Sequence, residues 1–172
     1  MTAASVGDFR ELMAGFPTGV AVLTTMDPNG DPVGFTCTAL CSVSLEPPML
    51  LVCIANRSRT LKALQAMEFF AVNMLHQHGR GAAEVFSAAG PDRFASVTWG
   101  LSPGAGLPCL TDHAHTVAEC RVRSSTLAGD HTVVIAGVIS VRHLNSDPPL
   151  LYGLRQYAVW PGGHANGTAV LR

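Results

Sequence analysis

Residues 56–60, Asn-Arg-Ser-Arg-Thr, combine the side-chain types that bind phosphate: two guanidiniums, two hydroxyls and an amide. They lie between the apolar run 49–55 and a segment from Leu61 onward in which apolar residues recur at helical spacing. A helix that begins here adds unpaired N–H groups and the positive end of its dipole. The sequence therefore indicates an anion site. The alternative is an ordinary helix cap by Asn56 or Ser58 with solvated arginines.

The stretch 34–48 is dense in small and hydroxyl residues and separates two expected strands. Such residues let the backbone approach a flat ligand, and main-chain N–H groups aimed at it stabilise negative charge without an ionised side chain. Hydroxyl contacts would come from Thr36, Thr38, Ser42 and Ser44. The alternative is a polar loop held by Ser/Thr turns.

Histidine occurs in two further groups of interest. In the tripeptide 129–131, Gly-Asp-His, a tight turn presents an imidazole that either packs against a ligand or faces water. The best set of metal-ligating residue types is Cys109, His113, His115 and Cys120. His-x-His puts two imidazoles on one face of a strand, but the same spacing occurs in turns with solvated histidines. We predict no metal site.

Several catalytic signatures are absent from the sequence. It lacks the Gly-x-Gly-x-x-Gly fingerprint and the P-loop, which argues against the doubly wound nucleotide-binding folds. It also lacks Gly-x-Ser-x-Gly and His-Glu-x-x-His, which argues against a serine hydrolase and a zinc protease. Catalysis by protein side chains alone therefore has little support.

The elements that must position these groups are mostly short strands. A helix is expected over 8–14 behind an Asp8 cap, followed by a hairpin of 19–25 and 32–35 around the turn 27–30. The run 49–55 is apolar at every position, which predicts a central strand buried on both faces. A helix from Leu61 follows.

The second half of the chain repeats this character. Strands are expected at 69–75, 116–123, 131–141 and 150–160, with a short helix around Ala82 to Phe86 and a long surface connection from 90 to 106. In 116–123, residues Ala118, Cys120 and Val122 should face the core, and Glu119, Arg121 and Arg123 should face water. About seven strands without regular βαβ alternation predict a mainly β fold, an antiparallel closed or split barrel with a few short helices.

Length and composition limit the possibilities further. The 172 residues suit one domain, expected at 1–161 with a loosely ordered tail at 162–172. With 48% hydrophobic and only 13% charged residues, a subunit interface is expected, most simply in a homodimer. The net charge of −1 argues against nucleic acid. Five irregularly spaced cysteines predict reduced thiols and a cytoplasmic location, and we expect neither a leader peptide nor a membrane span.

Six segments in this order resemble the short-chain flavin reductases, the reductase components of two-component flavin-dependent monooxygenases. The resemblance runs from about Phe9 to Tyr157. The matching segments are Phe16–Val20, Gly34–Thr36, Ser42–Pro48, Phe70–Asn73, Asp92–Phe94 and Gly129–His131.

This resemblance implies an FMN-binding split barrel, usually a homodimer with flavin sites near the subunit interface. It implies that NADH or NADPH passes hydride to N5 of FMN or FAD, and that reduced flavin diffuses to an oxygenase partner.

The resemblance also implies roles for individual positions. The isoalloxazine and ribityl chain would be lined by Thr36, Cys37, Thr38, Ala39, Ser42, Val43 and Ser44. The phosphate would be held by Ala55, Asn56, Arg57, Ser58 and Thr60, with Phe94 covering the rings. The nicotinamide would lie beside Gly129, Asp130 and His131, the catalytic candidate, with Tyr152 and Arg155 in the same pocket.

The chain departs from the family at one point and leaves two other functions open. Where relatives often read Thr-Ala-Ser-Ser-Phe, this chain has Thr36-Cys-Thr-Ala-Leu40, which bears on the choice between FMN and FAD. A split-barrel oxidase with tightly bound FMN acting on a small molecule is one alternative. A non-catalytic cofactor-binding barrel is the other.

Overall fold

The computed structural model describes residues 3–90 and 92–161, so the expected tail at 162–172 lies outside the described residues. The helices are α1 (Val6–Ala14), α2 (Arg59–Met67), α3 (Arg80–Ser87) and the 3₁₀ turn η1 (Phe94–Ser96). The strands are β1 (Thr18–Gly19), β2 (Ala21–Met26), β3 (Pro32–Cys37), β4 (Leu40–Leu45), β5 (Pro48–Ala55), β6 (Phe69–Leu75), β7 (Gly100–Leu101), β8 (Pro108–Cys109), β9 (Ala114–Ala128), β10 (His131–His143), β11 (Leu150–Gly153) and β12 (Gln156–Val159).

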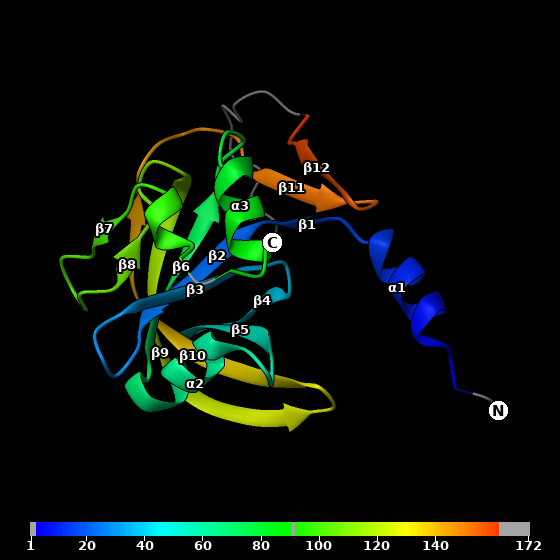
Figure 1. Cartoon of the computed structure of the whole chain (residues 1–172), viewed down its shortest axis with the longest axis horizontal. Helices are drawn as coiled ribbons and strands as arrows, with labels where there is room; N and C mark the ends of the chain where they lie inside the picture. Colours follow the sequence, from blue (N-terminus) through cyan, green and yellow to red (C-terminus); the bar gives the residue numbers. More distant parts are fainter. Residues whose placement is uncertain (1–2, 91, 162–172) are drawn as a thin grey trace.

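Seven strands form the main sheet, in the order β3-β2-β6-β9-β10-β5-β4, and every neighbouring pair is antiparallel. The two edge strands, β3 and β4, are consecutive in the chain and joined by Thr38 and Ala39 only. The sheet therefore curls back on itself without a closing ladder between these two edges in the described residues. This arrangement confirms the predicted antiparallel split barrel (Figure 1).

The barrel interior is filled from alternate positions of its strands. Leu23, Val52, Ile54, Phe70 and Val72 are fully buried in the largest core cluster. Helix α2 packs on β2 and β3, and α3 packs on the same two strands. Within the described residues, no helix combines the length and the apolar character that crossing a membrane requires.

Strand β5 differs from the prediction of a central strand buried on both faces. It is next to the edge strand β4, and its burial alternates: Leu50, Val52 and Ile54 are buried, whereas Met49, Leu51 and Cys53 remain half-exposed. The reason is that one face of β5 lines the barrel and, within one chain, no layer seals the other.

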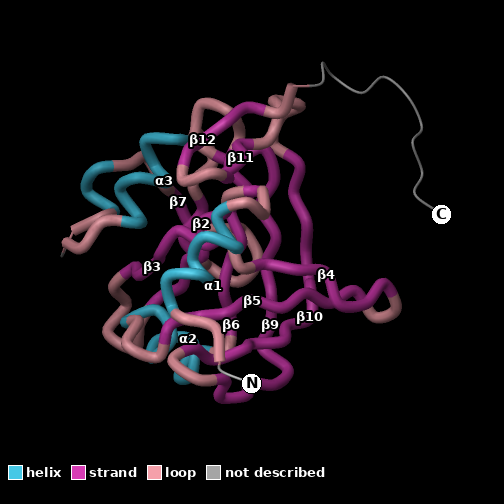
Figure 2. The backbone as a smooth tube through the Cα atoms, turned by 90° about the vertical axis from the view of Figure 1, so that its right-hand side faces the viewer, coloured by secondary structure: helices cyan, strands magenta, loops and turns pink. Residues whose placement is uncertain are grey.

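The N-terminal helix also differs from the prediction. It begins at Val6, and Ser5 is its N-cap: the Ser5 hydroxyl accepts from the Asp8 N–H, and the Asp8 carboxylate accepts from the Ser5 N–H. Asp8 is therefore the third helical residue of a capping box and not the cap. Helix α1 projects from one side of the barrel in Figure 1 and lies in front of the strands in the perpendicular view of Figure 2; none of its residues is buried.

Two other expectations are corrected by the tertiary structure. The single strand expected over 150–160 is the hairpin of β11 and β12, because Leu154 and Arg155 adopt positive φ angles of 50° and 60° that reverse the chain. Glu119 does not face water: it is only 6% exposed, because the connection before β8 covers it and donates hydrogen bonds to it. That connection contains η1 and β7 as well as loop.

Candidate functional site

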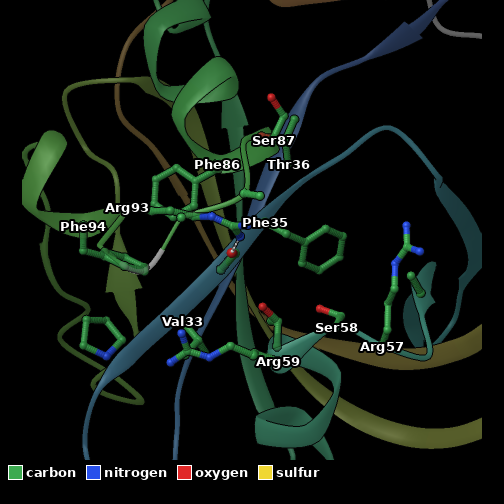
Figure 3. A pocket seen from close by; sticks show the side chains of 16 residues that line it. Val33, Phe35, Thr36, Arg57, Ser58, Arg59, Phe86, Ser87, Arg93 and Phe94 are labelled. Carbon is green, nitrogen blue, oxygen red and sulfur yellow. Dashed lines mark hydrogen bonds between the residues drawn. The ribbon is translucent and has the colours of Figure 1, made fainter.

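A cleft of about 650 Å³ opens where β3, the start of α2 and the end of α3 meet (Figure 3). Its walls come from segments far apart in the chain. The lining residues are Pro32, Val33, Gly34, Phe35, Thr36, Ala55, Arg57, Ser58, Arg59, Thr60, Phe86, Ser87, Ala89, Gly90, Arg93 and Phe94. Of the predicted ligand contacts, the structure brings Thr36, Ala55, Arg57, Ser58, Thr60 and Phe94 together here.

The cleft is cationic. Arg57, Arg59 and Arg93 line it, and no Asp or Glu is among the described residues of its wall. Ser58 is the N-cap of α2, yet its side chain makes no cap hydrogen bond within the described chain. The first N–H groups of a helix have no intrahelical acceptor, so this end of α2 offers free donors to an anion.

Arg93 ties the two walls of the cleft together. Its Nη1 donates to the Gly34 carbonyl of β3 at 2.6 Å, and its Nη2 donates to the Ala88 carbonyl at the end of α3 at 2.7 Å. Burial lowers the pKa of Arg93, and the charge of Arg59 lowers it further. The Nε atom is buried without a hydrogen-bond partner in the described residues, so the guanidinium retains an unsatisfied donor.

Gly34 allows the close packing beneath the cleft. A Cβ at this position would lie 2.7 Å from the Leu23 carbonyl and 3.1 Å from the Phe86 ring. The Thr36 hydroxyl donates to the Ala83 carbonyl of α3 at 2.6 Å, so it anchors β3 to that helix. Glycine and threonine here therefore fix the spacing between strand and helix.

The rest of the predicted ring-binding stretch lies outside this cleft. Cys37 is buried in the barrel, and burial raises the pKa of its thiol to about 11. The five remaining positions lie at the corner after β3 and along the edge strand β4, where all but the half-buried Ser44 are exposed. They are Thr38, Ala39, Ser42, Val43 and Ser44.

Asn56 holds the Gly-Asp-His turn against the end of β5. Its side-chain amide donates to the Gly129 carbonyl at 3.1 Å, and its Oδ1 accepts from the Thr132 hydroxyl at 2.8 Å. The Asn56 N–H donates to the Asp130 carbonyl at 3.0 Å. Through these three hydrogen bonds, Asn56 links the end of β5 to the turn before β10 and the start of β10. Its neighbours in the chain, Ala55 and Arg57, line the cleft.

The turn itself places Asp130 and His131 as a pair. The Asp130 carboxylate and the His131 Nδ1 are 2.7 Å apart, and this hydrogen bond and the histidine's charge lower the pKa of Asp130. His131 is opposite Ala55 in the ladder of β10 and β5, so its backbone is one strand away from the wall of the cleft. Gly129 has a φ of +62°, which explains the glycine in this turn.

Two predicted contacts are not among the residues that line the cleft. Tyr152 pairs with Thr18 of β1, and its ring lies tilted against that of Tyr157 with the centroids 5.2 Å apart; Arg155 is exposed at the turn of the β11–β12 hairpin. The candidate metal residues are likewise not assembled: among the described residues, no three His, Cys, Asp or Glu side chains are grouped to hold an ion.

Arg59 is one of the two guanidiniums of the predicted anion site at residues 56–60; it is the first residue of α2 and lines the cleft. One other arginine of the cleft, Arg93, was not among the predicted contacts. Arg93 lies in the Asp92–Phe94 segment. Its hydrogen bond to Gly34 of β3 joins residues more than 50 positions apart in the sequence, and its other bond is to the end of α3. No local pattern reports such a contact.

A split barrel with a cationic cleft at a strand-to-helix junction suits a protein that binds an anionic cofactor. The flavin reductase like domain matches residues 13–161, so the chain belongs to the flavin reductase family. It is 51% identical to a flavin reductase (NADPH) of Lentzea aerocolonigenes, over 91% of each chain. It is 44% identical to a flavin reductase (NADH) of Kitasatospora aureofaciens, over 95% of this chain and 86% of that one. The solved nitrilotriacetate monooxygenase component B from Mycobacterium thermoresistibile has a TM-score of 0.87 at 33% identity, covering 96% of this chain and 92% of that one.

The chain is therefore an NAD(P)H-dependent flavin reductase, and its cofactors are a flavin and a reduced nicotinamide. The cleft fits the phosphate end of a flavin nucleotide. It provides an open helix start, a cap hydroxyl without an intramolecular cap bond, and the unsatisfied Nε of Arg93 beside Arg59.

Proposed function

We propose that this protein reduces FMN or FAD with NADH or NADPH and releases the product to a separate monooxygenase. The observation that carries this proposal is the cationic cleft, formed at the start of α2 one strand away from the Asp130–His131 pair. The start of α2 would bind the flavin phosphate, and the histidine turn on the adjacent strand would bind the nicotinamide coenzyme. This placement suits two nucleotides whose rings lie against each other. The similar component B of a monooxygenase supports the separate acceptor.

The proposal assigns a role to each group of residues. Ser58, Thr60 and the first N–H groups of α2 hold the flavin phosphate, and Arg57, Arg59 and Arg93 neutralise its charge. Phe94 covers one side of the cleft. Thr36, Thr38, Ala39 and Ser42 to Ser44 follow the ring system along β3, the corner and β4, whereas the Cys37 side chain is buried in the barrel. Asp130 and His131 contact the nicotinamide.

The chain's contribution to the chemistry is binding and orientation. When bound, the flavin supplies an electron-accepting ring and the reduced nicotinamide supplies the hydride. Because hydride transfer requires no protein acid or base, the absence of a side-chain catalytic constellation from the sequence is consistent with this role. The cleft would hold the flavin phosphate at the start of α2, and the Asp130–His131 turn would orient the coenzyme one strand away.

We further propose a homodimer as the working form and a single functional domain over 1–161. Large exposed apolar side chains support the dimer, among them Leu45 at 88% exposure. All five cysteines are free in the structure, which supports a reducing, cytoplasmic compartment.

The deciding experiment measures anaerobic oxidation of NADH and of NADPH at 340 nm with FMN, FAD and riboflavin in turn. We expect turnover with at least one pair, and transfer of the reduced flavin through a dialysis membrane to cytochrome c. A purified protein that stays yellow and reduces only its own flavin would instead identify a prosthetic group. Failure to oxidise either coenzyme with any flavin would contradict the proposal.

A further inference from the structure

Three histidines meet where β6 ends, β9 begins and α3 starts. His76 directly follows β6, and His113 and His115 flank Ala114, the first residue of β9. The His76 N–H donates to the His113 carbonyl at 3.1 Å. The same carbonyl lies against Gly79, the N-cap of α3, where an added Cβ would be only 2.5 Å away from it. We name His76, His113 and His115 the histidine cluster.

The hydrogen bonds of the buried His76 require a neutral ring. Its Nε2 is 3.1 Å from the Asp112 carbonyl, which can only accept, so Nε2 carries the proton. Its Nδ1 accepts from the His78 N–H at 3.1 Å, so Nδ1 has no proton. A second proton on this ring would set two donors against each other and break the bond to His78.

His113 resists protonation because its ring is buried. Its Nε2 has no hydrogen-bond partner among residues 3–90 and 92–161. Burial lowers the pKa of His113, Asp112 opposes this shift only in part, and His76 adds to it. A proton on this ring would therefore place a charge where little compensates for the loss of water.

His115 is linked to His143 of β10 through the buried Thr116 hydroxyl. The hydroxyl oxygen is 3.0 Å from the Nδ1 of His115 and 3.1 Å from the Nδ1 of His143. If both rings were protonated, both would donate to this oxygen, and the hydroxyl proton would lose its acceptor. Burial lowers the pKa of His115, His76 and His143 lower it further, and Asp147 of the connection from β10 to β11 raises it by less.

Helix α3 links the histidine cluster to the cleft. It starts at Arg80, directly after Gly79, and its last residue, Ser87, belongs to the wall of the cleft (Figure 3). Arg80 is paired with Glu84 one turn along the helix at 2.7 Å. A displacement of the helix start therefore moves one wall of the cleft.

The connection from β10 to β11 is fastened to the same place. The Gln77 N–H donates to the Pro148 carbonyl at 2.8 Å, and His76 forms a β-bridge with Pro149. The next residue, Leu150, is buried in the core cluster that contains the cleft residue Phe94. The connection therefore supports the cleft from a second direction.

We propose that the histidine cluster is a proton-operated clasp: its neutral rings fasten the start of α3 and the β10–β11 connection, and its protonated rings release both, which lowers the affinity of the cleft for flavin. The carboxylates that face the cluster, Asp112 and Asp147, reduce this effect without reversing it.

The direction of the pH dependence follows from the two lowered pKa values. His113 and His115 have pKa values below the ordinary 6.5 in the closed form, so the released form binds protons first as the pH falls. The clasp is therefore closed above pH 6.5 and is released as the pH falls through the window below it. The effect on flavin rests on the proposed flavin site, whereas the release itself does not.

Trp99 reports the release without any ligand, because its ring centroid lies 5.4 Å from that of Phe94. Trp160→Phe leaves Trp99 as the single tryptophan, and its fluorescence is followed from about pH 8 to about pH 5. We expect one reversible transition with a midpoint below 6.5 and a retained circular dichroism spectrum. The absence of a transition, or a simultaneous loss of the circular dichroism signal, would overturn the clasp.

Variants of the cluster test its cause in the same background. His113→Gln with His115→Gln keeps polar side chains that take up no proton, so the transition should disappear or move to lower pH. His78→Gln, which removes an exposed imidazole, is the control and should leave the midpoint unchanged. Asp147→Asn keeps all three histidines and should raise the midpoint, because its charge favours protonated His115 in the closed form. An unchanged midpoint in both the double glutamine variant and Asp147→Asn would contradict the proposal.

Flavin affinity tests the consequence for the cleft. FAD is the probe, because the phosphate monoester of FMN itself titrates near about pH 6 and the diphosphate of FAD does not. Between about pH 8 and about pH 5 the FAD Kd of the wild type should rise at least about tenfold, as the closed fraction falls. In the double glutamine variant it should rise less than about twofold. Equal rises in the two proteins would refute the link to the cleft. If neither FAD nor riboflavin binds at about pH 8, the proposed function fails, and the Trp99 transition still decides whether the clasp exists.

Discussion

Ser58 and Thr60 are the side chains on which the phosphate assignment depends most. Ser58 is the half-buried cap of α2, and Thr60 is buried within the first turn. Hydrogen bonds to charged groups contribute about 1.5–3 kcal/mol each. Ser58→Ala with Thr60→Ala should therefore raise the FMN Kd by at least about tenfold, as followed by flavin fluorescence. Ser124→Ala with Ser125→Ala, on an exposed part of β9, is the matched control. Full affinity in the Ser58/Thr60 variant would relocate the phosphate.

His131 belongs to the coenzyme side of the proposed site. Its Nδ1 is held by the Asp130 carboxylate at 2.7 Å, so the ring has a defined orientation. His131→Ala should raise the KM for the nicotinamide coenzyme about tenfold and leave the flavin Kd unchanged. His143→Ala, at the other end of β10, should change neither quantity. Steady-state kinetics with NADH and NADPH provide the measurement, and unaltered KM values would remove His131 from the site.

The contact between β3, β2 and α3 sets the floor of the cleft, and Gly34 permits it. An alanine there would place Cβ 2.7 Å from the Leu23 carbonyl, a rigid backbone atom. Overpacking of this kind costs about 1–3 kcal/mol, so Gly34→Ala should lower the melting temperature and the flavin affinity together. Gly19→Ala is the control, because no atom lies within 4 Å of its added Cβ. Equal melting temperatures for the two variants would contradict the close approach.

The connection before β8 is pinned to the sheet by Glu119. Burial raises the pKa of this carboxyl, but hydrogen bonds from Ser102, Ser140 (2.6 Å) and the Ala105 N–H (2.9 Å) outweigh it, so the net pKa is lowered. The stabilisation is therefore complete above the ordinary pKa of 4.5 and is lost as the pH falls through the lower folded-state value.

Glu119→Gln should accordingly destabilise the protein at neutral pH by about 1.5–3 kcal/mol, the contribution of a hydrogen bond to a charged group. The difference from wild type should shrink as the pH falls below 4.5. Urea unfolding at a series of pH values measures both effects. Glu68→Gln, an exposed carboxylate near Arg121, is the control. A difference that does not change with pH would assign the effect of Glu119 to packing alone.

At the scale of the whole molecule, the proposed homodimer predicts a mass in solution twice that of one 18.0 kDa chain. Light scattering measures this mass, and a particle of 18.0 kDa would contradict the homodimer.

The sequence by itself determined the elements whose cause is local. The hairpin of β2 and β3 follows from its turn residues, α2 and α3 from apolar spacing, and the turn after β9 from Gly129. The anion-binding character of residues 56–60 was also readable, because charge, hydroxyls and a helix start coincide in five consecutive positions. Short strands and turns predicted an antiparallel barrel, closed or split, and the resemblance to the flavin reductases specified the split form.

Only the tertiary structure decided how distant segments meet. In the structure, Glu119 is buried beneath a loop, and β5 lies beside the edge strand although a central position was predicted. Arg93, which follows α3 in the chain, donates a hydrogen bond to the Gly34 carbonyl of β3. The tertiary structure also left Tyr152 and Arg155 out of the lining of the cleft and left no residue of α1 buried. These outcomes depend on long-range pairing and packing, and the period of a strand or helix states which side is apolar but not what covers that side.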